Sequence, residues 1–350
     1  MNDRLSSAKR LDYVDLSKAL AISSVLLIHC SADRFALYEA GSLPWLTNAF
    51  WGTISRWAVP MFLMCSGALM NDPRRELSIK KLFSKHILHF VVVFTLWAGF
   101  YELIRIANAL GDAPLRALIG LSVRNMVAGT THYHLYYFYL VLALYLALPL
   151  TRIIAEHASE EQLRYILALW FLAGTVLSFL QCYDDIAALI PTAFQYILPT
   201  IFLCPGLGLL GYCMGQHPTK RSIAPLGLFL LSFAVCYGMT WKRSVEAGGF
   251  DGFYLDAFNP FVLLMAVGVF GMAQRISLGP KTAKAVHLIS SASFCIYLSH
   301  PFFQMIMMQD RFEALPPLWS VPFQAGLLLG ISLILYLILK RIPVAKHWLI

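Results

Sequence analysis

Long apolar runs alternate with short polar segments along most of the chain. A bilayer core needs about 20 residues of apolar helix, and ten runs approach that length. They lie at about residues 14–33, 49–70, 84–106, 133–152, 163–181, 195–215, 223–241, 257–275, 287–308 and 319–340. The segment 107–131 is too polar to span, although PLRALIGLSVRNMV within it predicts a short surface helix. The pattern predicts an all-α, polytopic membrane bundle with about ten transmembrane helices, forming one domain over residues 1–350.

Composition supports this class. Of 350 residues, 59% are hydrophobic and 13% charged, whereas soluble domains carry about a quarter charged residues. The first run follows a polar, basic N-terminus without a clear cleavage site, so we expect a retained span rather than a signal peptide. The seven cysteines are scattered without a C-x-x-C pair, which predicts buried small side chains and no metal site.

The basic residues predict the orientation. If the N-terminus is cytoplasmic, 19 of the 27 Lys and Arg residues fall in cytoplasmic segments, and Arg56 lies inside a span. Seven basic residues fall on the opposite side: Arg34, Arg105, Arg116, Arg124, Lys242, Arg243 and Arg311. Membrane proteins concentrate Lys and Arg on the cytoplasmic side, so both termini are predicted inside. The net charge of +8 then reflects orientation rather than nucleic-acid binding.

The first span, KALAISSVLLIHC, carries Lys18 near one end and His29 near the other. Eleven residues of α-helix bring both to one face, roughly 16 Å apart along the axis. Ionisable groups inside a span are costly and point to function. His29 suits general acid–base chemistry, and Asp15 lies one turn before Lys18 on a similar face. A lysine that reaches the headgroups and a histidine bonded to a nearby carbonyl are the structural alternatives.

The second span, ISRWAVPMFLMCSGALM, contains Arg56, and Pro60 predicts a kink in it. The pair Ser66 and Gly67 favours close helix packing. An arginine inside a span needs a partner or water, so Arg56 is a candidate site residue.

Two further spans carry histidines. THYHLYYFYLVLALYLALPL begins with His132 and His134, which would point about 160° apart on an α-helix, so that only one could face the interior. SSASFCIYLSHPFF contains Tyr297 and His300, and we expect Pro301 to kink or break this helix.

Four stretches in this order resemble the acyltransferase-3 family of membrane acyltransferases. They are RLDYVDLSKALAISSVLLIHC, SRWAVPMFLMCSGALM, HYHLYYFYLVLALYLALPL and SFCIYLSHPFF. The likeness is greatest to its single-domain glycan O-acetyltransferases, of the enterobacterial common antigen O-acetyltransferase type. His29 matches the essential histidine of the family, and Lys18 stands where the family has arginine. The other matching positions are Arg56, Ser66, His134 and His300.

The resemblance implies that an acyl group, by default acetyl, moves from cytoplasmic acyl-CoA to a hydroxyl of an extracytoplasmic glycan or lipid-linked sugar. His29 would act as general base, with Arg56 or His134 beside the developing oxyanion. The implied substrate contacts are Asp15, Lys18, Ser66, Tyr297 and His300. Acyl-CoA would be a co-substrate, with no permanently bound cofactor and no nucleic-acid partner, in a bacterial inner membrane. Succinyl transfer, and a transporter or flippase for a lipid-linked or small polar solute, are the alternatives.

The orientation gives a first prediction. Reporter fusions after Ile350 and in the loop 32–48 should locate the first inside the cell and the second outside, because most basic residues then lie inside. Alkaline phosphatase and fluorescent-protein activities measure this directly. The reverse labelling would contradict both the topology and the two-sided chemistry.

Overall fold

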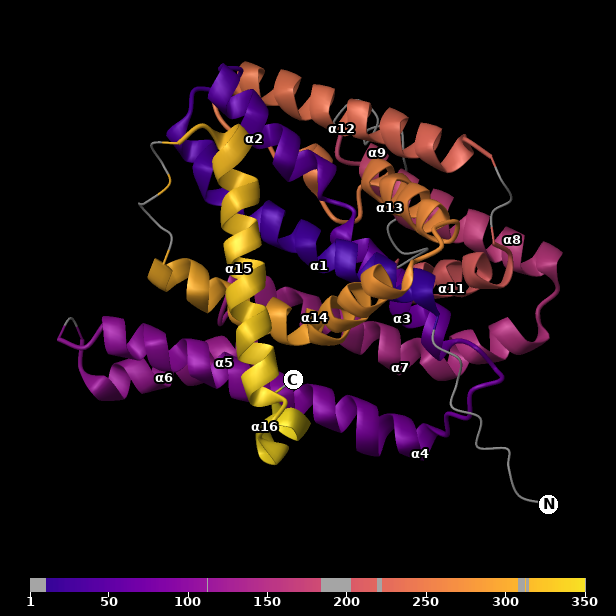
Figure 1. Ribbon diagram of the computed structural model, residues 1–350, viewed down its shortest axis with the longest axis horizontal. Coiled ribbons are helices and arrows are strands. Elements are labelled where there is room, and N and C mark those ends of the chain that lie inside the picture. The colour runs from indigo at the N-terminus through magenta and orange to yellow at the C-terminus, as the bar shows by residue number, and fades with distance from the viewer. Residues whose placement is uncertain are drawn as a thin grey trace.

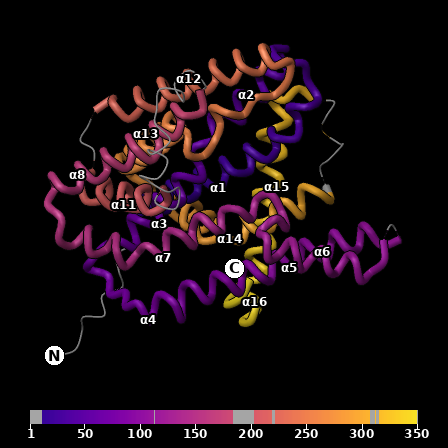
Figure 2. The backbone as a smooth tube through the Cα atoms, turned by 180° about the vertical axis from the view of Figure 1, so that it is seen from behind, coloured from indigo at the N-terminus to yellow at the C-terminus, as the bar shows by residue number. Residues whose placement is uncertain are grey.

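Helices form nearly all of the structure, a computed structural model that describes residues 11–111, 113–183, 203–218, 222–307, 312 and 315–349. Figures 1 and 2 show them as one bundle, with α1 running through its middle. The α-helices are α1 (Asp12–Ala32), α2 (Leu43–Ile54), α3 (Ala58–Met70), α4 (Ile79–Lys81), α5 (Leu88–Asn108), α6 (Leu115–Ala128), α7 (Tyr136–His157), α8 (Glu160–Leu169), α9 (Leu177–Leu180), α11 (Leu203–Gln216), α12 (Ala224–Ala247), α13 (Pro260–Ala273), α14 (Pro280–Met307), α15 (Pro317–Leu339) and α16 (Pro343–Trp348). The all-α prediction is confirmed, and α6 is the short helix expected within 107–131.

Shorter elements of two kinds complete the described chain. The 3₁₀ turns are η1 (Asp33–Leu37), η3 (Tyr133–Leu135) and η7 (Phe253–Leu255). Two π-helical segments, η2 (Leu82–Ile87) and η4 (Trp170–Val176), continue directly into α5 and α9. Such wider turns inside helices are frequent at functional sites.

Seven helical segments among the described residues are long and apolar enough to cross a membrane. They are Asp12–Leu37, Ile79–Asn108, Leu115–His157, Glu160–Leu180, Ala224–Ala247, Phe253–Ala273 and Pro317–Leu339. The protein is therefore a multi-pass helical membrane protein. The other three predicted runs fall on shorter or more polar helices: 49–70 on α2 and α3, 195–215 on α11, and 287–308 on α14. Residues 195–202 and 308 of these runs lie outside the described residues.

Helix α1 is enclosed by other helices. It packs against α2, α3, α13, α14 and α15, and Ala21, Ile22 and Leu26 are fully buried. Four polar side chains of α1 are buried and so face protein rather than lipid, where each unsatisfied group would be costly: Asp15, Ser17, Ser24 and Ser31.

The second predicted span is broken at Ser55–Trp57, between α2 and α3. We expected a kink at Pro60, but Pro60 lies in the first turn of α3, where its missing N–H leaves no helical bond unmade. The break is stabilised locally, because the indole N–H of Trp57 donates to the Ile54 carbonyl at 2.7 Å. Arg56 therefore lies at the junction of two half-helices.

Helix α14 continues through Pro301, so the expected break is absent. A proline removes only one backbone hydrogen bond of a helix. Packing of α14 against α1 and α15 stabilises the rest of the helix. The ring of His300 is fixed within the same turn, since its Nδ1 lies 3.1 Å from the Ile296 carbonyl oxygen.

Glycines set the contact between α3 and α11. A Cβ on Gly67 would lie 2.0 Å from the carbonyl oxygen of Gly208, and one on Gly211 would lie 2.1 Å from that of Met64. Small residues at such positions let membrane helices approach closely. The backbones of α3 and α11 thus touch, next to the position of Ser66 on α3.

This contact predicts the cost of one added methyl group. Gly67→Ala should destabilise the protein by about 1–3 kcal/mol, because the two backbones must separate. Gly99→Ala in α5 is the matched control, since its Cβ would meet no atom within 4 Å. The Gly99→Ala variant should be as stable as the wild type or up to about 1 kcal/mol more stable, because alanine has a higher helix propensity than glycine. Thermal unfolding in detergent measures both, and equal stabilities would contradict the close contact.

Candidate active site

Three predicted site histidines from distant segments meet near one end of α1. The ring centroids of His29 and His300 are 4.9 Å apart, and those of His134 and His300 are 5.7 Å apart. A fourth imidazole joins them, because Nδ1 of His132 lies 2.7 Å from Nδ1 of His134. We call His29, His132, His134 and His300 the histidine cluster.

The inclusion of His132 overturns one sequence expectation. We predicted that His132 and His134 point in opposite directions, as on an α-helix, but their ring centroids are only 4.7 Å apart. Residues Tyr133–Leu135 form a 3₁₀ turn, and His132 has an extended backbone with φ of −152°. The spacing of the two histidines was visible in the sequence, but the assumed helical geometry was wrong there.

Burial and hydrogen bonding differ among these rings. His300 is 0% exposed and His134 1%, whereas His29 keeps partial exposure. The neutral His300 ring donates from Nδ1 to the Ile296 carbonyl, which leaves Nε2 as the acceptor nitrogen. Neither His300 Nε2 nor His134 Nε2 has a hydrogen-bond partner among the described residues. Within the described part of the chain, the cluster thus contains two buried imidazole nitrogens that are not hydrogen-bonded. Of its three predicted members, His29 is the most exposed.

Tyrosines enclose the histidine cluster. The Tyr297 hydroxyl donates to the His134 carbonyl, and the Tyr101 hydroxyl donates to the Leu298 carbonyl at 2.7 Å. Tyr101 also packs on the His132 ring at 4.5 Å, and Tyr133 lies 5.1 Å from the ring of His29. These contacts tie η3 to α14 and fix the direction of the imidazoles.

Arg56 supplies positive charge beside this cluster. Its Nε is buried without a hydrogen-bond partner in the described part of the chain. The guanidinium lies within electrostatic reach of His29, of the Tyr136 hydroxyl and of Asp256. A buried donor with a spare N–H can stabilise an oxyanion that develops close to His29.

A cavity of about 180 Å³ extends from Lys18 to Tyr297. Ser66 also lines it, among apolar and aromatic side chains of α1, α3, α5, α7 and α14. The Ser66 hydroxyl donates to the Phe62 carbonyl at 2.9 Å, so it presents mainly its acceptor side. Tyr297 connects this cavity to the histidine cluster, because its hydroxyl donates to the backbone carbonyl of His134.

Asp15 has helix partners instead of a place in this cavity. Its carboxylate accepts a hydrogen bond of 2.5 Å from the Ser290 hydroxyl, and His287 Nε2 lies 3.7 Å away. Both partners belong to α14. Asp15 therefore links α1 to α14. It lies one turn before Lys18, which lines the cavity.

Among the described residues, no group of three His, Cys, Asp or Glu side chains is arranged to hold a metal ion. The imidazoles of the cluster can transfer protons and form hydrogen bonds, next to the guanidinium of Arg56.

A comparison with known families identifies the class of protein. The acyltransferase domain of the acyltransferase 3 family matches residues 11–347, so the chain belongs to that family. It is a membrane acyltransferase, and its reaction requires an acyl donor and an acceptor. No curated protein and no solved structure matches the chain. The predicted family is confirmed, while the glycan O-acetyltransferase type stays a prediction.

The two α1 residues should respond differently to mutation. Asp15→Ala should lower the unfolding temperature, because the buried Ser290 hydroxyl loses the carboxylate that accepts its hydrogen bond, and the KM for donor should stay near wild type. Lys18→Ala should instead raise the KM for acyl-CoA, while Lys18→Arg should retain activity. Thermal unfolding and steady-state kinetics separate the two effects. A donor KM unchanged in Lys18→Ala would remove Lys18 from the site.

Proposed function

We propose that this acyltransferase moves an acetyl group from cytoplasmic acetyl-CoA to a hydroxyl of an extracytoplasmic cell-surface glycan, in a bacterial inner membrane. One observation carries the proposal: Tyr297 lines the cavity that contains Lys18, and its hydroxyl bonds to the backbone carbonyl of His134, a member of the histidine cluster. A donor on one side and an acceptor on the other could meet there.

The cavity suits a thin, extended chain. Its volume of about 180 Å³ is too small for a nucleotide but accommodates the narrow arm of an acyl thioester. Lys18 lies roughly 16 Å from His29 along α1. As a point charge it can contact a phosphate of the donor while the thioester lies beside the imidazoles.

The proposed chemistry begins with the acceptor. The free nitrogen of His29 removes the hydroxyl proton as the oxygen attacks the thioester carbonyl carbon. Arg56 stabilises the negative oxygen of the tetrahedral intermediate. Collapse breaks the carbon–sulfur bond, and the leaving thiolate takes the proton from His29. The buried rings of His134 and His300 position His29 and the acceptor.

A vesicle assay tests the reaction and its direction. Protein in sealed vesicles receives radiolabelled acetyl-CoA inside and candidate glycans outside, and the label on glycan is counted. Label on the outer glycan with retained CoA inside supports acyl transfer across the membrane. Movement of an intact solute without acyl transfer would instead identify a transporter or flippase.

His29 gives the sharpest mutational prediction. His29→Ala should lower turnover by about 10²-fold or more, the usual scale for losing a general base. His29→Gln should be nearly as inactive, because an amide keeps a hydrogen bond but accepts no proton. His157→Ala, at the exposed end of α7, is the control and should retain activity. Normal turnover of a well-folded Gln variant would make His29 a structural residue.

A further inference from the structure

A second, larger cavity lies where α16 meets η2 and the start of α5. Its volume is about 460 Å³, and its lining contains no Asp or Glu. We propose that this pocket binds the phosphorylated adenine nucleotide of the acyl donor, with Lys85 and Lys346 as phosphate contacts and Trp348 as the surface on which the base stacks. The inference rests on the proposed use of acyl-CoA and assigns residues to its nucleotide end.

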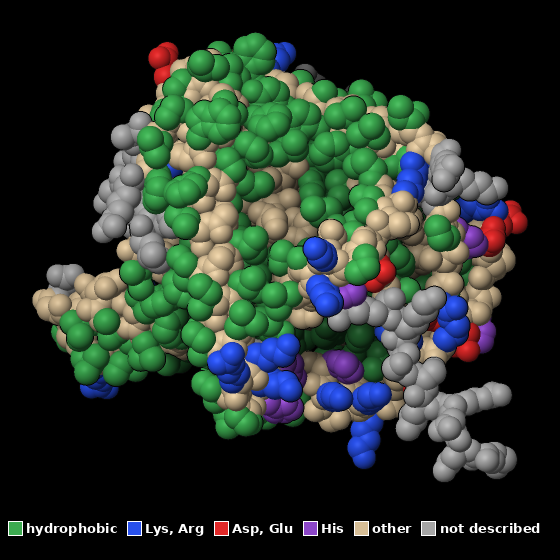
Figure 3. All heavy atoms as spheres, in the orientation of Figure 1, with side chains coloured by type: hydrophobic (Ala, Val, Ile, Leu, Met, Phe, Trp, Pro, Cys, Tyr) green, Lys and Arg blue, Asp and Glu red, His purple; other side chains and the backbone are tan. Residues whose placement is uncertain are grey.

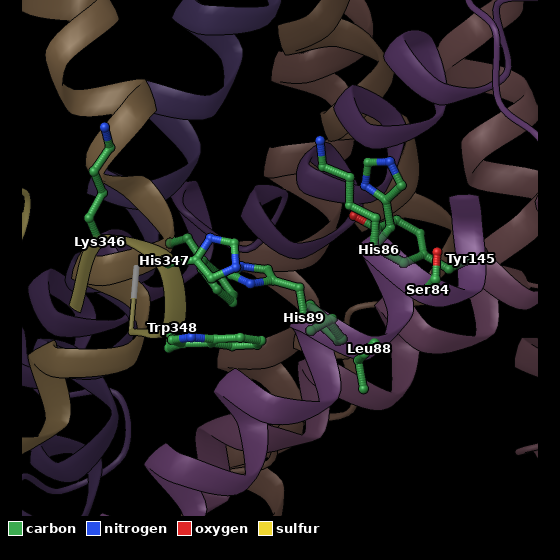
Figure 4. A pocket seen from close by; sticks show the side chains of 11 residues that line it. Ser84, His86, Leu88, His89, Tyr145, Lys346, His347 and Trp348 are labelled. Atoms are coloured by element: carbon green, nitrogen blue, oxygen red, sulfur yellow. The ribbon is translucent and has the colours of Figure 1, made fainter. Parts of the chain in front are cut away.

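The pocket combines cations with flat rings. Lys85 comes from η2 and Lys346 from α16, and both are exposed. Figure 4 shows the rings of His89, His347 and Trp348 close together between the two elements. The centroid distances are 4.6 Å from His347 to Trp348 and 6.1 Å from His89 to Trp348.

This composition matches the chemistry of a nucleotide polyphosphate. Lysine ammonium groups are strong phosphate binders, and the imidazoles add hydrogen-bond donors. A partly buried indole provides a stacking face that every base can use. Among the described residues, no carboxylate forms an ion pair with Lys85 or Lys346, so their charges are available to a ligand.

The pocket adjoins the narrow cavity that leads to the histidine cluster. Phe90, Tyr145 and Phe294 line both spaces. A ligand with a bulky anionic head and a thin arm could therefore place its head between α16 and η2 and its arm beside Lys18.

Helix α16 is held in position by the bundle. The indole N–H of Trp97 on α5 donates to the Leu349 carbonyl at 3.2 Å, and α16 packs on α5. Figure 3 shows Lys, Arg and His side chains gathered on the surface around α16 and the start of the α4–α5 segment. On the predicted topology this surface faces the cytoplasm, where acyl-CoA is found.

An anionic phospholipid headgroup offers the same phosphate chemistry, so the test must separate the two sources. Full-length protein is purified into nanodiscs of zwitterionic lipid, and into nanodiscs containing phosphatidylglycerol. Calorimetric titration with CoA and with adenosine 3′,5′-bisphosphate measures binding. Two variants are compared with the wild type: a double variant that combines Lys85→Ala and Lys346→Ala, and the single variant Trp348→Ala. Lys80→Ala is the matched control, an exposed lysine one turn before the pocket and outside its lining.

We expect both ligands to bind the wild type and the Lys80→Ala control equally. The double lysine variant should lose about tenfold or more in affinity for both, the scale of one charge-assisted hydrogen bond. Trp348→Ala should weaken both as well, and phosphatidylglycerol should change CoA affinity little. Thermal unfolding temperatures near wild type show that the variants are folded.

Other outcomes decide against the proposal. Unchanged CoA affinity in the pocket variants, with acyl transfer intact in the wild type, would overturn the pocket assignment and leave the proposed function standing. Binding of phosphatidylglycerol alone, lost in the lysine variant, would identify a lipid site instead. Lysine-dependent binding of the bisphosphate without transfer from any acyl-CoA would support the nucleotide pocket and contradict the proposed function.

Discussion

The bilayer core offers no hydrogen-bond partners, and this constraint explains the arrangement of the site. Polar and ionisable side chains can remain at membrane depth only if other helices enclose them. Helix α1 meets this condition because α2, α3, α13, α14 and α15 surround it. The same enclosure that permits Lys18 and His29 also removes competing water, which strengthens electrostatic interactions with any charge that forms there. Packing around one helix is thus the basis of the fold and of the chemistry.

The helical class, most helix positions and the family could be predicted from the sequence, because apolar periodicity and motif order are local properties. The residues His29, His134 and His300 were predicted from the resemblance, but their meeting depends on how α1, η3 and α14 pack. The position of His132 could not be predicted, because the residues after it, Tyr133–Leu135, form a 3₁₀ turn instead of the α-helix that the apolar pattern indicates. The roles of Asp15 and of α16 depend on contacts between segments more than 200 residues apart, which no local pattern encodes.

The larger cavity is lined by lysines and imidazoles, and it adjoins a narrower, mainly apolar cavity that contains Lys18. Phe90, Tyr145 and Phe294 stand between them and belong to α5, α7 and α14. A bulky, highly charged head cannot follow a thin arm into the narrower cavity of about 180 Å³. For the proposed acyl-CoA donor, this difference in width would let the acyl arm enter the narrower cavity while the nucleotide stays in the larger one.

The break at Ser55–Trp57 has a consequence for biogenesis. Helix α2 has 12 residues and α3 has 13, so each reaches only about 18–20 Å, short of the ~30 Å hydrocarbon core. Arg56 between them would face lipid if the pair entered alone. One of their enclosing partners, α15, is synthesised more than 240 residues later. Helix α2 can therefore reach its packed position against α15 only when nearly the whole chain has been synthesised.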